Sequence, residues 1–127
     1  MIYTRSIKKN TDFKKMYYTS KYKIGMFTVI YLRRSKEKDA ANLGITVSKK
    51  VGNAVLRNRV KRIILAAYNE LEKSSNFKGY NIVIVARKNS NKVKMWDIFK
   101  EIKKNIFILK KETINGKFRV KRSVKYI

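Results

Sequence analysis

Cationic side chains crowd the segment from Lys49 to Tyr68, and four cations and an amide lie within six consecutive positions of it: Arg57, Asn58, Arg59, Lys61 and Arg62. No acid lies between Asp39 and Glu70 to neutralise them. Closely spaced cations suit a target with fixed, regularly spaced negative charges, and a nucleic-acid backbone is the commonest such target. The chemistry that this segment offers is therefore phosphate binding.

The chain as a whole is strongly basic, with 33 Lys and Arg against 8 Asp and Glu in 127 residues and a formal net charge of +25. Repulsion at that charge opposes compaction, so we expect an acidic partner. The hydrophobic content of 44%, with 12% aromatic residues, is nevertheless sufficient for a core. These values indicate one small folded domain.

The residue types indicate no catalytic site of the chain's own. Cys and His are absent, which excludes disulfides, thiolate nucleophiles, zinc sites built on these residues and imidazole catalysis. The few acids are scattered, without pairs at metal-ligand spacing. Ser48 and Lys49 are adjacent, but in so basic a chain this pair is better interpreted as polar surface than as a nucleophile and its base. The longest apolar stretch, Met26 to Leu32, is too short to span a bilayer, so we expect a cytoplasmic protein with no membrane partner.

The cations must be positioned by a long helix, because apolar residues recur at helical spacing on its other side: Leu56, Val60, Ile63, Ile64, Ala67 and Leu71. The patterns predict helices over residues 10–18, 53–73 and 93–109, and strands over residues 26–33, 43–48 and 80–86. The order is α-β-β-α-β-α, and an additional strand near residues 20–26 is left open. The connection from Ser35 to Ala41 is short enough for an antiparallel pair of strands.

The predicted fold class is α/β, in the form of an α+β two-layer sandwich with helices on one face of a small mixed sheet. Residues 1–110 are expected to form a single nucleic-acid-binding domain, an RNA-binding domain if the resemblance described next holds. Residues 111–127 contain six cations and one acid and are interpreted as a basic tail. A terminal strand through Phe118, Val120 and Val124 is the alternative.

The segment LGITVSKKVGNAVLRNRVKRIILAAY, from Leu43 to Tyr68, resembles the signature of the protein subunit of bacterial ribonuclease P. The hallmark is a strand ending in Lys-Lys, then Gly-Asn-Ala, then an Arg-Asn-Arg helix that continues into Lys-Arg. Asn10-Thr11-Asp12-Phe13 and the IVIVARK strand extend the resemblance over residues 5–109. It implies a left-handed βαβ crossover, an exception to the usual right-handed rule.

The resemblance also implies a function. A protein of this family is a subunit of an endoribonuclease in which a catalytic RNA removes the 5′ leader from precursor transfer RNA. The Mg²⁺ that activates water is then held mainly by the RNA, and the protein alone is inactive. The implied partners are the catalytic RNA subunit and precursor transfer RNA, and no obligate protein partner is evident.

Two RNA-binding surfaces follow from the resemblance. The surface for the catalytic RNA comprises Lys49, Lys50, Asn53, Arg57, Asn58, Arg59, Lys61 and Arg62. The cleft for the precursor leader comprises Phe13, Lys14, Tyr17 and Tyr31, with Ile30 as the alternative to Tyr31 because a shift of one residue exchanges the faces of a strand. Aromatic rings stack on bases without reading sequence.

Two features of these surfaces leave alternatives open. On residue spacing alone, Phe13 and Tyr17, one helical turn apart, indicate a core face. Leu65 stands where the family usually has another basic residue, which either weakens that end of the contact or marks an apolar protein contact.

Two other functions are weighed against this one. A ribosomal or other structural RNA-binding protein explains the charge but neither the Arg-Asn-Arg helix nor the aromatic pair. A sequence-specific DNA-binding protein would use the basic helix in a major groove, yet the sequence shows no helix-turn-helix partner and no dimerisation heptads.

Overall fold

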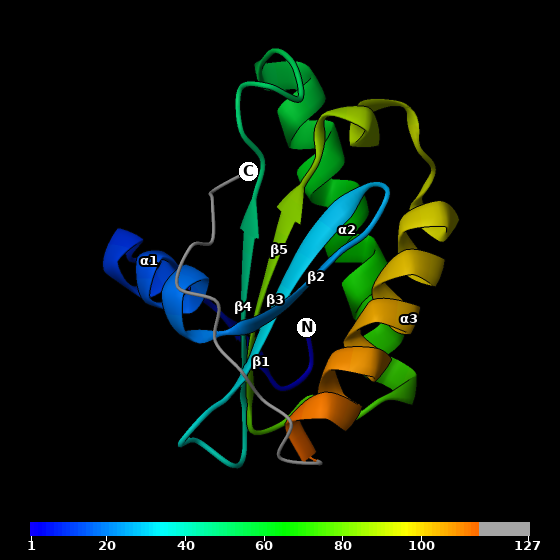
Figure 1. Ribbon diagram of the computed structural model, residues 1–127. Helices are drawn as coiled ribbons and strands as arrows, with labels where there is room; N and C mark the ends of the chain where they lie inside the picture. The colour runs from blue at the N-terminus through cyan, green and yellow to red at the C-terminus, as the bar shows by residue number, and fades with distance from the viewer. Residues whose placement is uncertain (115–127) are drawn as a thin grey trace.

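Figure 1 shows the computed structural model of the chain, which describes residues 1–114. The elements in chain order are β1 (Thr4–Ser6), α1 (Asn10–Thr19), β2 (Lys21–Ile24), β3 (Thr28–Arg34), β4 (Ala41–Thr46), α2 (Ala54–Ser74), β5 (Tyr80–Ala86), the 3-10 helix η1 (Lys88–Lys92) and α3 (Met95–Ile114). The six predicted elements are confirmed, and the strand left open near residues 20–26 is β2. β1 was not predicted, since three residues are too few to show a period.

The strands form one mixed sheet in the order β1-β4-β5-β3-β2. β5 pairs parallel with β4 and antiparallel with β3. The expected antiparallel pairing of the strands over residues 26–33 and 43–48 is therefore wrong, because β5 lies between them. The physical reason is that β5, with its nearly continuous apolar sequence, is buried on both faces and takes the centre of the sheet.

Helices cover both faces of this sheet rather than one, which corrects the expectation from the sequence (Figure 1). α2 and α3 lie on one face, where Ile64 and Ile102 pack in a large core cluster with Ile84. α1 lies on the other face, where Met16 packs with Val83 in a second, smaller cluster. Alternate residues of β5 thus point into two different cores.

α2 begins where the sequence analysis placed it. Gly52 has φ +151°, a backbone conformation that L side chains rarely adopt. Asn53 then caps the helix, with its side chain accepting a hydrogen bond of 3.0 Å from the backbone N–H of Leu56. The parallel strands β4 and β5 and the intervening α2 form the βαβ unit for which the resemblance implies a left-handed crossover.

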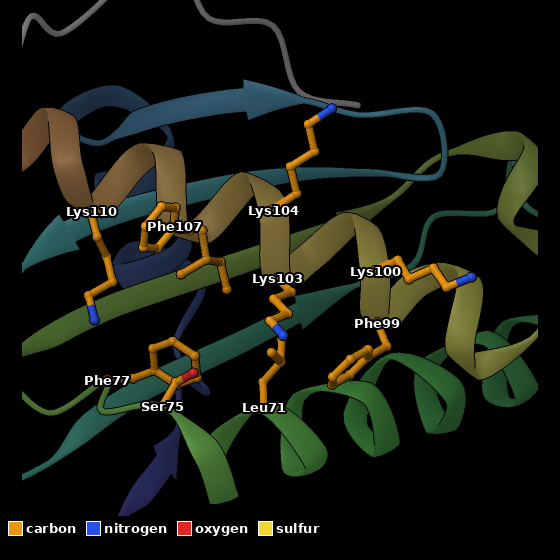
Figure 2. A pocket seen from close by; sticks show the side chains of 10 residues that line it. Leu71, Ser75, Phe77, Phe99, Lys100, Lys103, Lys104, Phe107 and Lys110 are labelled. Carbon is orange, nitrogen blue, oxygen red and sulfur yellow. The ribbon is translucent and has the colours of Figure 1, made fainter.

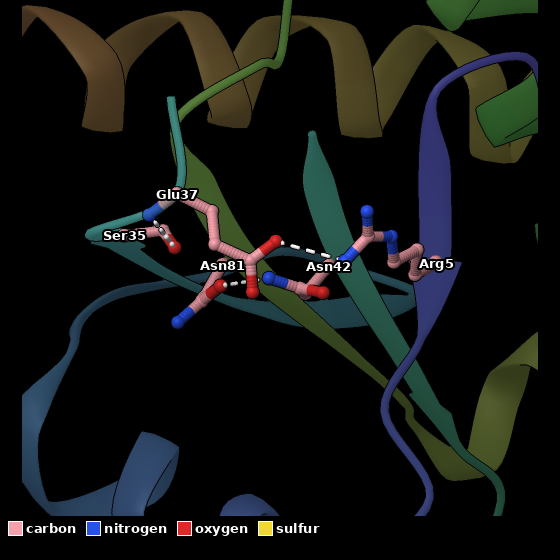
Figure 3. Close-up of polar contacts among 5 residues, drawn as sticks. All are labelled: Arg5, Ser35, Glu37, Asn42 and Asn81. Carbon is pink, nitrogen blue, oxygen red and sulfur yellow. Dashed lines mark hydrogen bonds and ion pairs between the residues drawn. The ribbon is translucent and has the colours of Figure 1, made fainter. Parts of the chain in front are cut away.

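Polar contacts join β1, β4 and β5 near the start of the two parallel strands (Figure 3). Asn42 and Asn81 are register partners, and the Asn42 amide donates to the Asn81 side-chain oxygen at 2.8 Å. Arg5 forms an ion pair of 3.0 Å with Glu37, whose backbone N–H donates to the Ser35 hydroxyl. These contacts tie the loop after β3 to the edge of the sheet.

α3 continues to Ile114, so residues 111–114, which were assigned to the basic tail, are helical. The rest of that tail and the alternative strand through Phe118, Val120 and Val124 lie outside the described residues. Within residues 1–114, no helix combines the length and the apolar character needed to cross a bilayer.

Candidate nucleic-acid interface

A groove between α1, the end of β4 and the start of α2 brings together residues from both predicted RNA surfaces. This α1–α2 groove has a volume of about 680 Å³ and is lined by Asn10, Phe13, Lys14, Tyr17, Ile45, Thr46, Val47, Ala54, Arg57, Asn58 and Lys61. The leader cleft and the cationic helix face, which the sequence analysis treated as separate surfaces, therefore meet in one depression.

Phe13 lies against β4 because Gly44 leaves room for its ring. A Cβ added at Gly44 would lie 2.5 Å from Cε1 of Phe13, closer than real Cβ atoms approach. Phe13 is partly buried, packs on the smaller core and still lines the groove. Gly44 was not among the predicted site residues, although a glycine inside a strand often marks such a close approach.

Tyr17 is mostly a core residue, with 9% of its surface exposed. Its hydroxyl is 3.1 Å from Oγ1 of Thr46. Burial raises the pKa of the Tyr17 hydroxyl, and the hydrogen bond with Thr46 offsets part of that effect. Little of this side chain is accessible from the groove that it lines, so the core interpretation from residue spacing holds for most of Tyr17.

Tyr31 does not line the groove, which corrects the expectation that it contributes to the cleft. It is 1% exposed and lies between the rings of Tyr17 and Tyr22, at centroid distances of 5.0 and 5.6 Å. Ile30, the alternative, is 0% exposed and belongs to the core on the other face. Both are covered because β3 lies between helices on the two faces of the sheet.

Three cations face one another across the groove without an acid among its lining residues. Lys14, on α1, is exposed, and Arg57 and Lys61 come from successive turns of α2. The Nε atom of Arg57 is buried and has no hydrogen-bond partner among the residues that the structure describes. Because that atom is buried, a ligand would meet the accessible charge of the three side chains, and three cations without an acid beside them favour an anion.

Arg59 points away from the groove and binds the protein's own backbone. Its guanidinium donates to the carbonyl oxygens of Asn91 at 2.9 Å and Val93 at 3.3 Å, which ties α2 to the segment around η1. Leu65 packs, partly buried, against the larger core. The departure from the family pattern at this position is thus an apolar contact within the protein.

The remaining predicted residues lie around the start of α2, outside the groove lining. Lys49 and Lys50 are exposed in the turn before the helix, Arg62 is exposed on the helix, and Asn53 serves as the N-cap. They extend the cationic surface beyond the groove.

The carboxylates do not fit a metal site built by side chains. Within the described part of the chain, no three His, Cys, Asp or Glu side chains gather closely enough to hold an ion. Most of the carboxylates bind other groups of the protein: Glu37, Glu70, Glu72, Asp97, Glu101 and Glu112. The lining of the α1–α2 groove, by contrast, offers cations to phosphates and an aromatic ring to bases.

Known proteins resemble this chain in sequence and in fold. The family model described as Ribonuclease P matches residues 1–111. The ribonuclease P protein component of Clostridioides difficile is 42% identical over 100 residues, which cover 79% of this chain and 87% of that protein. The corresponding component of Listeria innocua is 36% identical over 118 residues, 87% of this chain and 95% of that protein.

Solved structures show the same fold. The RNase P protein of Staphylococcus aureus, at 34% identity, superposes with a TM-score of 0.71 over 81% of this chain and 93% of that one. The RNase P protein of Thermotoga maritima, at 23% identity, has a TM-score of 0.69 over 84% of this chain and 96% of that one.

Proposed function

The chain belongs to the ribonuclease P protein family, and on that premise we propose that it is the protein subunit of ribonuclease P, which binds the catalytic RNA and assists the removal of 5′ leaders from precursor transfer RNA. The observation that carries this proposal is the α1–α2 groove, in which an accessible aromatic ring and three cations face one space without an acid. Such a groove suits a single strand, whose bases stack while its phosphates bind cations.

The two sides of the groove have different roles in this proposal. Phe13 and Lys14 on α1 hold the leader, with Phe13 offering a ring to a base and Lys14 binding a phosphate. The exposed cations around the start of α2, among them Lys50 and Arg62, bind the catalytic RNA. Arg57 and Lys61 lie where the two RNA strands approach each other, because they line the groove from the α2 side.

The protein contributes binding and positioning in this reaction. The cleavage is the hydrolysis of a phosphodiester, and Mg²⁺ supplies it with an activated water. We assign that ion to the RNA subunit, since most of the described carboxylates bind groups within the protein. Because bacterial transfer RNA precursors are made in the cytoplasm, the same function places the protein there.

Reconstitution tests the function directly. Adding the protein to a cognate catalytic RNA at limiting Mg²⁺ should raise the rate of precursor cleavage, because the cationic surface relieves repulsion between the two RNAs. The protein alone, treated with nuclease to remove RNA, should cleave nothing. Cleavage by the RNA-free protein, or no gain in the reconstituted particle, would contradict the proposal.

The leader site is tested by Phe13→Ala. Loss of a stacking ring should weaken binding of the reconstituted particle to precursor by about 1–3 kcal/mol and leave its affinity for mature transfer RNA unchanged. Tyr18→Ala is the matched control, since Tyr18 is an exposed aromatic residue on the same helix outside the groove lining. Equal losses for precursor and mature transfer RNA would remove Phe13 from the leader site.

A further inference from the structure

The outer side of α3 carries both aromatic and cationic side chains, on the sheet face opposite α1. Within a helix of 3.6 residues per turn they fall on one broad side: Trp96, Phe99, Lys100, Lys103, Lys104, Phe107, Lys110 and Lys111. Trp96 is 55% exposed and Phe107 is 58% exposed. Large rings with more than half of their surface in water are available to a partner.

A groove runs between this side of α3 and the second half of α2 (Figure 2). This α2–α3 groove has a volume of about 540 Å³, and none of its lining residues is acidic. In Figure 2 the Phe99 ring and Leu71 lie between the two helices, and the Lys103 side chain extends into the same space. The Nζ atom of Lys103 lies 5.9 Å from the centroid of the Phe99 ring, and that of Lys111 lies 4.6 Å from the centroid of the Phe107 ring.

The acids of α3 are engaged with other groups of the protein. Glu101 accepts hydrogen bonds from the turn before β3, among them one of 2.8 Å from the backbone N–H of Thr28. Glu112 forms an ion pair with Lys21, and Asp97 accepts from the backbone N–H of Lys94. Among residues 1–114, no acid pairs with the lysines of the α3 surface. Their charge is available to a ligand.

We propose that this side of α3 is a second RNA-binding site, which takes a single-stranded segment with its bases on Trp96 and Phe107 and its phosphates on Lys100, Lys103 and Lys104. Trp96 and Phe107 are eleven positions apart, about 16 Å along a helix, which leaves room for several nucleotides. Because α1 and α3 lie on opposite faces of the sheet, the site can be filled while the α1–α2 groove holds another strand.

Charge argues against other occupants. Residues 115–127 carry Lys117, Arg119, Lys121, Arg122 and Lys125 and no acid, and a second copy of the chain has the same net charge of +25. Both would be repelled. An amphipathic acidic peptide would need a continuous apolar ridge as its seat, whereas here Lys100, Lys103 and Lys104 stand between Trp96 and Phe107 along the helix. Rings interspersed with cations are the pattern of single-strand binding.

Trp96 is the single tryptophan of the chain, so its fluorescence reports on this site alone. Titration of the full chain with a 12-nucleotide oligouridylate should quench the Trp96 signal to saturation, because a base stacks on the indole. Phe107→Ala should weaken the binding seen by quenching about five- to hundredfold. Lys100→Gln/Lys103→Gln/Lys104→Gln should weaken it at least about tenfold and lower the salt slope by about 2.

Two controls separate this site from general charge and from the proposed function. Lys36→Gln/Lys38→Gln/Lys78→Gln removes the same charge from exposed positions outside both grooves and should leave the quenching curve unchanged. Phe13→Ala should also leave the quenching curve unchanged, because Phe13 lines the α1–α2 groove and not the α3 surface.

Three outcomes would overturn the proposal. The first is that labelled oligouridylate binds the chain by anisotropy without quenching Trp96. The second is that the control triple variant weakens quenching as much as the α3 triple variant. The third is that an oligoglutamate of equal charge gives the stronger quenching, which would assign the surface to an acidic peptide.

Discussion

Glu72 is an acid with 3% of its surface exposed in a chain of high positive charge. Its carboxylate accepts hydrogen bonds from the backbone N–H of Ile2 at 2.5 Å, from that of Tyr3 at 3.3 Å and from the Thr4 hydroxyl. Burial tends to raise the pKa of Glu72, but these hydrogen bonds outweigh it, and the net pKa is lowered. One ionised side chain thus anchors the start of the chain and β1 to the end of α2.

We predict that Glu72→Gln lowers the free energy of unfolding at pH 7 by about 1–3 kcal/mol, because the backbone donors lose a charged acceptor. The pKa of Glu72 is lower in the folded than in the unfolded state, so its contribution is fully present above the unfolded pKa of about 4.3 and is lost as pH falls through the folded value. Urea unfolding measures the free energy of unfolding of the unchanged protein and of Glu72→Gln at pH 7 and pH 3. The difference between the two proteins should be smaller at pH 3.

The matched control is Glu70→Gln, on the same helix, where the carboxylate pairs with Lys73 at an exposed position. Its effect should stay within about 0.5 kcal/mol. If both substitutions lowered the free energy of unfolding equally, the hydrogen bonds that Glu72 accepts from the start of the chain would add nothing to stability.

Tyr17 and Phe13 differ in their exposure, and their substitutions should differ accordingly. We predict that Tyr17→Ala lowers the free energy of unfolding by about 3–5 kcal/mol, since its ring packs against Tyr31 in the smaller core. Affinities for precursor and mature transfer RNA should then fall together as folded protein is lost. Denaturant unfolding and the two binding assays should be carried out on the same variant. A variant that is as stable as the unchanged protein but has lost affinity for precursor alone would show that Tyr17 belongs to the leader site.

Three sides of α2 make three different kinds of contact. Val60, Ile64 and Leu71 are buried in the larger core. Arg57 and Lys61 line the α1–α2 groove from another side of the helix. On a third side, the guanidinium of Arg59 donates to the carbonyl oxygens of Asn91, in η1, and of Val93, directly after it. Cations that are equivalent in the sequence therefore have different physical roles.

We predict that Arg57→Ala/Lys61→Ala flattens the plot of log affinity against log salt by about 0.7–0.9 per lost phosphate contact, with little change in stability. Arg59→Ala should instead lower the free energy of unfolding by about 1.5–3 kcal/mol, because two charged hydrogen bonds to backbone oxygens are lost. Thermal unfolding and catalytic-RNA binding at several salt concentrations measure both effects. An unaltered salt slope in a folded Arg57→Ala/Lys61→Ala variant would remove these cations from the RNA interface.

The molecule as a whole carries far more cations than its own acids neutralise. Among the described residues three ion pairs form, Arg5 with Glu37, Lys21 with Glu112 and Lys73 with Glu70. The surplus positive charge covers the α1–α2 groove and the outer side of α3, on the two faces of the sheet. Self-repulsion in the free protein is the physical cost of this distribution.

We predict that the free protein melts at a higher temperature as salt rises from 50 to 500 mM sodium chloride, by about 4 °C for each 1 kcal/mol of repulsion screened. Circular dichroism at 222 nm follows the transition. A single-stranded RNA at the same ionic strength should raise the midpoint further, because it binds the folded state. A midpoint that does not change with salt would show that the cations lie too far apart to repel one another.

Local sequence patterns were sufficient to predict much of the secondary structure of this protein. The long helix, its cap at Asn53, the two-sided burial of β5 and the cationic run from Arg57 follow from residue types a few positions apart, so the sequence predicts them. The resemblance to the ribonuclease P protein rests on the same local segment, and the family match confirms it.

Contacts between residues far apart in the sequence could be identified only in the tertiary structure. Periodicity shows that a face is apolar but not which element covers it. For that reason the predicted pairing of β3 with β4, which β5 separates, and the predicted placement of all helices on one face were wrong. The observed placement buries Tyr31 and brings Phe13 into the groove that Arg57 lines. It also turns Arg59 toward the carbonyl oxygens of Asn91 and Val93, more than thirty residues away. Each of these depends on long-range packing, which residue spacing within one element does not encode.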